Sequence, residues 1–152
     1  MDTGHWELCC GISTEEFIAK QFGFIYLITN TVTGKKYIGK KQMKTIKKRP
    51  PLKGKKNRRC EEIETEWRTY SSSSNEVNSD IEKYGKDKFK FQIILFCNSK
   101  WELAYHEARL QFEYNVLLRE DYYNGIINLR IPKLKYPKDV STIKYETNDP
   151  QD

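Results

Sequence analysis

Two tyrosine tripeptides, ten residues apart, are the part of this chain whose residue types and spacing could do chemistry. FIY stands at 24–26 and YIG at 37–39. A phenol can orient water or relay a proton, and two phenols at one place could act on the same water molecule. The alternative is that Tyr26 and Tyr37 are an ordinary cross-strand aromatic pair.

A β-hairpin is the element that must bring these tyrosines together. Ile, Val and Tyr favour strands, and the intervening segment NTVTG at 30–34 supplies turn chemistry. Both tripeptides are therefore predicted to lie on antiparallel strands that face each other.

The carboxylate of Glu107 is a third candidate group, on a predicted helix. Ser99 and Glu102 form a capping box that begins this helix. One face of the helix carries apolar residues at the helical period, namely Leu103, Leu110, Tyr114 and Leu117. Glu107 lies on that face, where a charge is costly unless it is paired or binds a metal. The helix alone leaves both readings open.

A concentrated basic segment follows the first strand of the hairpin. The stretch from Lys35 to Arg59 contains 13 Lys or Arg and no Asp or Glu, so the rest of the chain is net acidic. Such a stretch is typical of binding to a phosphate backbone, and DNA is the expected partner. A solvated loop or a localisation-type basic run is the alternative. The residues expected to contact nucleic acid are Lys40, Lys41, Lys44, Lys47, Lys48, Arg49, Lys53, Lys55 and Lys56.

The remaining elements predict an α+β fold with a small three-stranded antiparallel sheet flanked by helices. FKFQIILFC at 89–97 is the third strand, and Ser74 is the N-cap of a helix through Tyr84. A capping box at 13–16 begins a short helix through Lys20, and 60–68 is predicted to form one or two helical turns. Pro and Gly among the lysines of 40–57 predict an exposed, inserted basic loop.

The paired tripeptides, the later glutamate and an asparagine in NGIIN at 124–128 together resemble the GIY-YIG nuclease family. The resemblance covers roughly 23–131, with Phe24 in place of the first glycine. It implies an N-terminal extension at 1–22, a nuclease domain at 23–131 and a polar tail at 132–152. It also implies a metal-dependent DNA endonuclease of a small phage or mobile-element type.

The resemblance assigns roles to individual residues. Tyr26 would be the general base for water or a close relay, Tyr37 would orient the water, and Glu107 would hold one Mg²⁺, or Mn²⁺ in its place. Asn128 would support the site. An arginine would stabilise the transition state, and the candidates are Arg58 and Arg59, with Arg68 in reserve. A phenol is a poor base at neutral pH, so lysines such as Lys40 and Lys41, or the arginine, would have to lower its pKa, or a neighbouring group would have to take the proton onward.

Composition limits the remaining possibilities. A chain of 152 residues fits one domain, and no apolar run approaches the roughly 20 residues that a membrane span needs. The N-terminus MDTGHWELCC lacks the regions of a signal peptide, so the expected location is the cytoplasm, that of the host cell if a phage encodes the protein. The four cysteines are scattered and predict neither a zinc site nor disulfides. A homodimer is compatible with the sequence.

Two other functions stay open at this stage. A non-catalytic nucleic-acid-binding protein could keep the scaffold and the basic segment, although binding by charge requires neither tyrosine nor Glu107. A basic accessory protein with a fortuitous hairpin would place the tyrosines far from Glu107.

Overall fold

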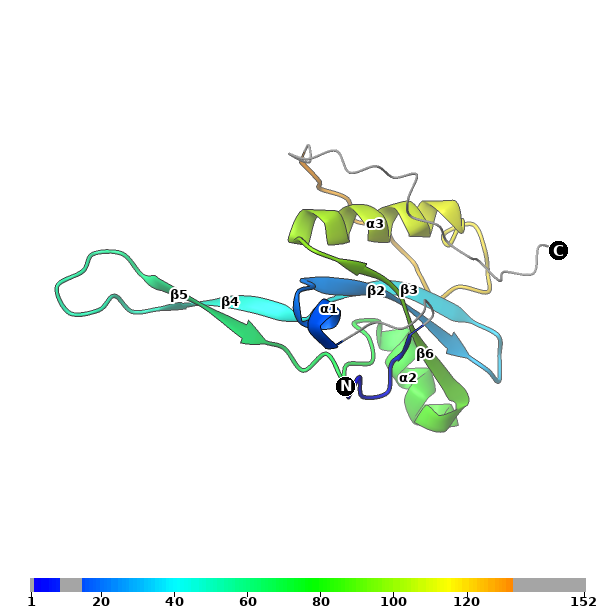
Figure 1. The fold of residues 1–152 in the computed structure, drawn as a ribbon. Coiled ribbons are helices and arrows are strands. Elements are labelled where there is room, and N and C mark those ends of the chain that lie inside the picture. Colours follow the sequence, from blue (N-terminus) through cyan, green and yellow to red (C-terminus); the bar gives the residue numbers. More distant parts are fainter. Residues whose placement is uncertain (1, 9–14, 133–152) are drawn as a thin grey trace.

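The computed structural model describes residues 2–8 and 15–132, and a four-stranded sheet lies at its centre (Figure 1). The strand order is β1-β6-β2-β3. The strands are β1 (Glu7–Leu8), β2 (Gly23–Asn30), β3 (Lys36–Gln42) and β6 (Phe89–Cys97). The predicted antiparallel pairing of β2 with β3 is confirmed, and β6, predicted as the third strand of the sheet, pairs antiparallel with β2. The expected count of three strands is wrong, because β1 adds a short parallel partner to β6 and two residues are too few to show an alternating pattern.

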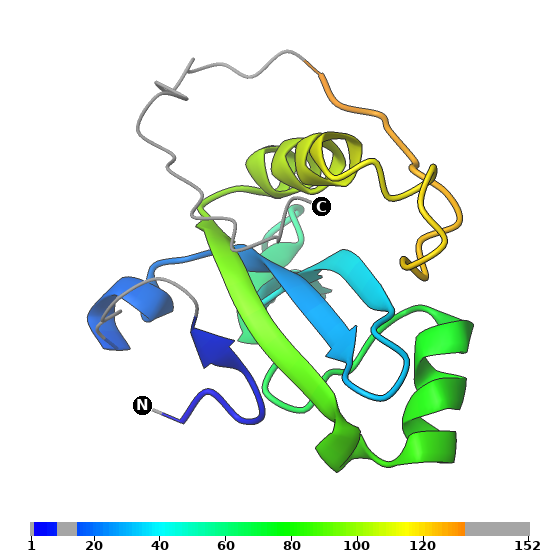
Figure 2. The ribbon, with the colours of Figure 1, turned by 90° about the vertical axis from the view of Figure 1, so that its right-hand side faces the viewer.

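Helices cover both faces of this sheet, as Figure 2 shows. Helix α3 (Lys100–Glu113) packs on one face, where Leu103 and Leu110 meet Ile25 and Ile38. The other face buries a larger aromatic core under α1 (Glu15–Ala19) and α2 (Asn75–Tyr84). A 3₁₀ turn, η1 (Lys86–Lys88), leads from α2 into β6.

The predicted helix starts are confirmed where the structure describes them. The Ser74 hydroxyl accepts a hydrogen bond from the Val77 amide at 3.4 Å, and that of Ser99 from the Glu102 amide at 3.2 Å. The capping box at 13–16 begins outside the described residues. The prediction for Leu117 is wrong, since α3 ends at Glu113 and Leu117 is 46% exposed.

The predicted basic loop and the helix after it are replaced by a β-hairpin, β4 (Lys44–Arg49) with β5 (Arg59–Glu64). We call this hairpin with its connecting residues 50–58 the arm. It projects away from the rest of the molecule (Figure 1). Cross-strand ion pairs explain why 59–64 is a strand despite its helix-favouring glutamates: Arg49 meets Glu61 at 2.6 Å and Lys44 meets Glu62 at 3.3 Å.

The N-terminal segment is part of the core. Trp6 is 3% exposed, and its indole N–H donates to the Trp67 carbonyl at 2.7 Å. Ile18 of α1 is also buried in this core, so the short helix is packed against the domain. Among the described residues, Cys60 and Cys97 are free thiols, and no helix is long and apolar enough to cross a membrane.

Candidate active site

The hairpin places the two tyrosines side by side on the face opposite α3. Tyr26 is paired with Gly39, and Tyr37 stands two residues before Gly39 on β3, so the tyrosines are diagonal neighbours on one face. Their ring centroids are 6.1 Å apart. The predicted convergence of the two phenols is therefore observed.

Gly39 provides the space that this arrangement needs. A Cβ atom at position 39 would lie 2.5 Å from the Tyr26 hydroxyl oxygen and 2.8 Å from the Tyr37 ring. Both contacts are too short, so any larger residue would push the phenols apart. Phe24, in contrast, fills the aromatic core beside Trp6 and Trp67.

Residues 70–73, which we call the hydroxyl-bearing segment, place further hydroxyl groups beside the two phenols. Tyr26 is hydrogen-bonded to the side chains of Tyr70 and Ser72, and Tyr37 to those of Ser72 and Ser73. These residues were not predicted from the sequence, because a run of four serines is typical of a linker or an N-cap. The one local hint of a functional segment is Tyr70, which directly precedes the serines.

The N-terminal segment holds this hydroxyl-bearing segment in place. The His5 ring nitrogen Nε2 lies 2.8 Å from the Tyr70 carbonyl oxygen, and the Trp6 indole binds the Trp67 carbonyl. Residues before β2 therefore position groups beside the tyrosines.

The pKa values of both phenols are set mainly by burial and not by nearby cations. Burial raises the pKa of Tyr26 well above its ordinary value, and it also raises the pKa of Tyr37. The expectation that lysines lower these pKa values is not met. Lys41 instead lies 4.2 Å from the centre of the Tyr70 ring and pairs with Glu66 at 2.9 Å.

Glu107 reaches the edge of the sheet at β3. Its side chain is 17% exposed, and its carboxylate lies 3.6 Å from the Lys40 ammonium, directly after the YIG tripeptide. Burial raises the pKa of Glu107, and hydrogen bonds and charge from Lys40 offset part of that effect. The Glu107 charge in turn raises the pKa of Tyr37. Tyr37 is therefore within electrostatic range of Glu107 across the β3 edge, which removes the support for a fortuitous hairpin.

An asparagine supports the YIG strand, and it is Asn124. Its Oδ1 accepts from the Ile38 amide at 3.1 Å and its Nδ2 donates to the Ile38 carbonyl at 2.8 Å. Gln111 of α3 donates to the same carbonyl at 3.0 Å. Because β3 is an edge strand, these groups would otherwise lack a partner strand. Asn128, the residue chosen from sequence, has an exposed side chain in the extended segment that follows.

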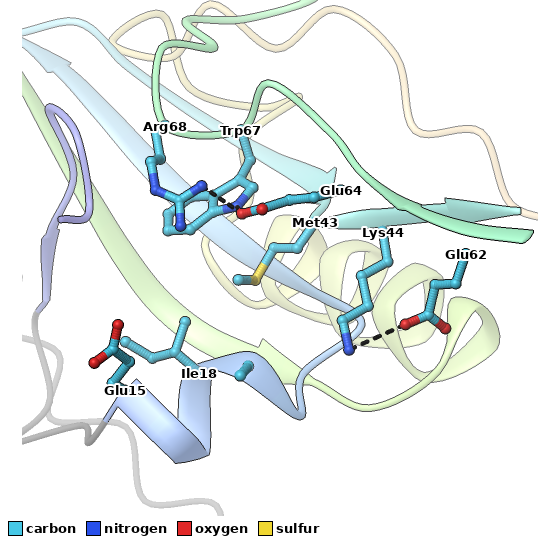
Figure 3. A pocket seen from close by; sticks show the side chains of 9 residues that line it. Glu15, Ile18, Met43, Lys44, Glu62, Glu64, Trp67 and Arg68 are labelled. Atoms are coloured by element: carbon cyan, nitrogen blue, oxygen red, sulfur yellow. Dashed lines mark hydrogen bonds and ion pairs between the residues drawn. The ribbon is translucent and has the colours of Figure 1, made fainter. Parts of the chain in front are cut away.

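The three arginine candidates have other surroundings. Arg58 and Arg59 are exposed residues of the projecting arm. Arg68 binds Glu64, donates to the Asp2 carbonyl and stacks on Trp67. It lines a pocket of about 280 Å³ between α1 and the base of the arm (Figure 3). The cation beside Glu107 is Lys40.

The other basic residues divide between the site and the arm. Lys41 faces the phenol side of β3, while Lys44 and Arg49 pair with glutamates of β5. Exposed side chains on β4 and at the tip belong to Lys47, Lys48, Lys53, Lys55 and Lys56. Their contact with DNA stays a prediction.

Glu107 offers a single carboxylate to a hard divalent cation. Within the described ranges no three His, Cys, Asp or Glu side chains cluster, so a tight all-protein metal cage is not formed there. Mg²⁺ commonly binds through one or two carboxylates together with substrate phosphates and water. A carboxylate that is largely buried, with its pKa raised by burial, gains from a cation placed against it. Glu107 is thus suited to hold such an ion.

Comparison with known proteins gives the family. A family model described as "Putative endonuclease segE, GIY-YIG domain" matches residues 6–127. Neither the curated proteins nor the solved structures gave a match. The match covers most of the chain, including both tyrosine tripeptides, the hydroxyl-bearing segment, Glu107 and Asn124. The chain belongs to the GIY-YIG nuclease family.

Proposed function

We propose that this protein is a metal-dependent DNA endonuclease that hydrolyses phosphodiester bonds at the β3 edge. Family membership implies endonuclease activity, DNA as substrate and use of a divalent metal in general terms. The observation that carries the specific proposal is the convergence of Tyr37, Lys40 and Glu107 around the YIG strand. Binding a phosphate backbone by charge would not require this combination.

Tyr37 is the phenol that meets the attacking water in this proposal. It is half-buried, whereas Tyr26 is 1% exposed and reaches its surroundings through Tyr70 and Ser72. As the water oxygen attacks phosphorus, its proton moves to the Tyr37 oxygen and the phenol proton passes to the Ser73 hydroxyl and on to solvent. The bond from phosphorus to the 3′ oxygen breaks, and that oxygen takes a proton from solvent. Tyr26 packs against Tyr37, with ring centroids 6.1 Å apart, and fixes its orientation, so the two tyrosines exchange the roles that the family resemblance implied.

Glu107 and Lys40 would together balance the charge on the phosphate, Glu107 by holding a cation and Lys40 with its own ammonium. A divalent cation held by Glu107 would neutralise negative charge that builds on the phosphoryl oxygens. Lys40, 40% exposed and 3.6 Å from that carboxylate, can turn its ammonium to a phosphoryl oxygen. Lys40 then does what the sequence analysis assigned to an arginine, with a point charge in place of a forked pair of hydrogen bonds.

The direct test is cleavage of supercoiled plasmid with Mg²⁺ or Mn²⁺ and with excess EDTA. We expect cleavage by the wild type only with metal. The variant Tyr37→Phe should cleave at least about 100-fold more slowly, the usual contribution of a positioned proton-transfer group. Tyr105→Phe removes a hydroxyl from an exposed tyrosine of α3 and should cleave like the wild type. A wild type that binds DNA but cleaves none with either metal would instead support the non-catalytic binding protein.

The identity of the catalytic cation is tested separately. Lys40→Gln should lower the cleavage rate by about 100-fold, as expected when one donor to a developing charge is lost. The double variant Arg58→Gln/Arg59→Gln should keep the wild-type rate under saturating DNA, because both residues lie on the arm. Single-turnover rates at saturation separate turnover from affinity. A slow double variant beside a normal Lys40→Gln would return the role to an arginine.

A further inference from the structure

The charge of the arm is unequal along its length. Near the base, glutamates of β5 neutralise basic residues: Glu62 pairs with Lys44, and Glu64 with Arg68. Glu61 pairs with Arg49 further out. The stretch 47–59 has eight basic residues and no acidic one, and Arg49 is the one among them with an ion pair described. The positive potential is therefore concentrated on the outer half of the arm, where the side chains are almost all exposed.

The tip of the arm has a defined conformation. The Lys55 amide donates to the Leu52 carbonyl at 2.9 Å, which closes a turn with Gly54 at φ +87°. Only glycine adopts such an angle without strain. The Arg59 guanidinium donates to the Pro50 carbonyl at 3.3 Å and ties the start of β5 to the residue that follows β4. Lysines on a fixed turn lose less conformational entropy when they bind than lysines on a flexible loop.

We propose that the arm is a DNA-binding ribbon whose tip grips the duplex about one helical turn away from the bond that is cut. The position of the cut relative to the tip rests on the proposed function, whereas binding of DNA by the arm does not. Strand β3 carries Lys40 at the candidate active site and leads through Met43 into β4. An extended chain rises about 3.3 Å per residue, so Arg49 lies up to about 30 Å from Lys40, and the tip residues lie further out on the projecting arm (Figure 1). One turn of B-DNA is about 34–36 Å long.

A two-stranded ribbon also has the right shape for B-DNA. The major groove, about 12 Å wide, admits such a ribbon, whereas the major groove of A-form RNA is deep and narrow. Two large apolar side chains are exposed among the lysines, Ile46 at 65% and Leu52 at 48%. Such groups can contact thymine methyl groups while the lysines bind phosphates. The occupant favoured by charge and shape is thus duplex DNA.

The test compares two charge-matched variants in EDTA, where binding is measured without cleavage. The tip variant is Lys53→Gln/Lys55→Gln/Lys56→Gln/Arg58→Gln. The control removes four exposed lysines around α2, η1 and the start of β6: Lys83→Gln/Lys86→Gln/Lys88→Gln/Lys90→Gln. We expect the tip variant to bind a 30-bp duplex at least tenfold more weakly at 0.15 M salt and to lower the salt slope by about 2–4 units, since each phosphate contact contributes roughly 0.9. The control should bind within about twofold of the wild type.

Duplex length gives a second measurement. Wild-type affinity should rise as the duplex is extended from about 8 to about 20 bp, whereas the tip variant should gain much less. Equal losses in the tip and control variants would overturn the proposal, because net charge would then explain binding. So would equal affinity of the wild type for duplex RNA, or a wild type that binds no duplex. The wild type could bind the duplex, with weaker binding by the tip variant, and yet cleave no DNA with any metal. That result would leave the arm proposal intact and overturn the proposed function.

Discussion

Replacing Glu107 with glutamine should lower the rate of metal-dependent DNA cleavage by at least about 10³-fold and leave DNA affinity within about twofold. The substitution keeps the shape of the side chain and removes the charge that would hold the cation. Loss of several kcal/mol of charge stabilisation in the transition state corresponds to a factor of this size. The measurement is a single-turnover cleavage rate, with binding in EDTA measured on the same DNA.

Glu113→Gln is the matched control on the same helix. Glu113 is an exposed carboxylate that pairs with Arg109 at 3.0 Å, so its removal should leave cleavage within about twofold. If Glu107→Gln cleaves normally, or if Glu113→Gln is equally slow, Glu107 does not hold the catalytic ion.

Thermal stability gives a readout of Glu107 that does not depend on cleavage. Because burial raises the folded-state pKa of Glu107, its carboxyl stabilises the fold below the unfolded pKa and loses that contribution as pH rises through the folded pKa. At neutral pH without metal, Glu107→Gln should therefore be at least as stable as the wild type. Millimolar Mg²⁺ or Mn²⁺ should raise the Tm of the wild type more than that of the variant, because a bound ligand stabilises the folded state.

The second large effect is expected at Asn124. Asn124→Ala removes two hydrogen bonds to the backbone of Ile38. The buried Ile38 N–H is then left without the acceptor that Asn124 provides. We expect the free energy of unfolding to fall by about 2–4 kcal/mol, from the two lost bonds and the unsatisfied amide. Cleavage should slow about tenfold or more at a temperature where the variant is folded, because Ile38 lies between Tyr37 and Gly39. Denaturant unfolding and single-turnover cleavage measure the two effects.

Asn128→Ala is the control, since it truncates an exposed asparagine four residues later. It should change stability by less than about 0.5 kcal/mol, as surface substitutions usually do. Asn124→Asp keeps an acceptor for the Ile38 amide but loses the donor to its carbonyl, so its stability should be no higher than that of the wild type. Equal effects of Asn124→Ala and Asn128→Ala would contradict the assignment of Asn124.

Elements with local signals could be predicted from the sequence alone. Residues that favour strands around a turn-forming segment predicted the β2–β3 hairpin, and its register brings Tyr26 and Tyr37 together. Ser74 and Ser99 marked the starts of α2 and α3 because a serine hydroxyl satisfies a free helix amide. Helical spacing also placed Glu107 on the packed side of α3.

Features that depend on contacts between distant segments could not be predicted in this way. The glutamates at 61–64 favour a helix until the lysines and arginine of β4 pair with them across the arm. Tyr70 and the serines after it join the tyrosines because Trp6 and His5 hold them there. Asn124, and not Asn128, supports β3 because it is the asparagine placed against an unpaired strand edge. Local propensity covers a few neighbouring residues, whereas these partners are brought together by burial of a common core.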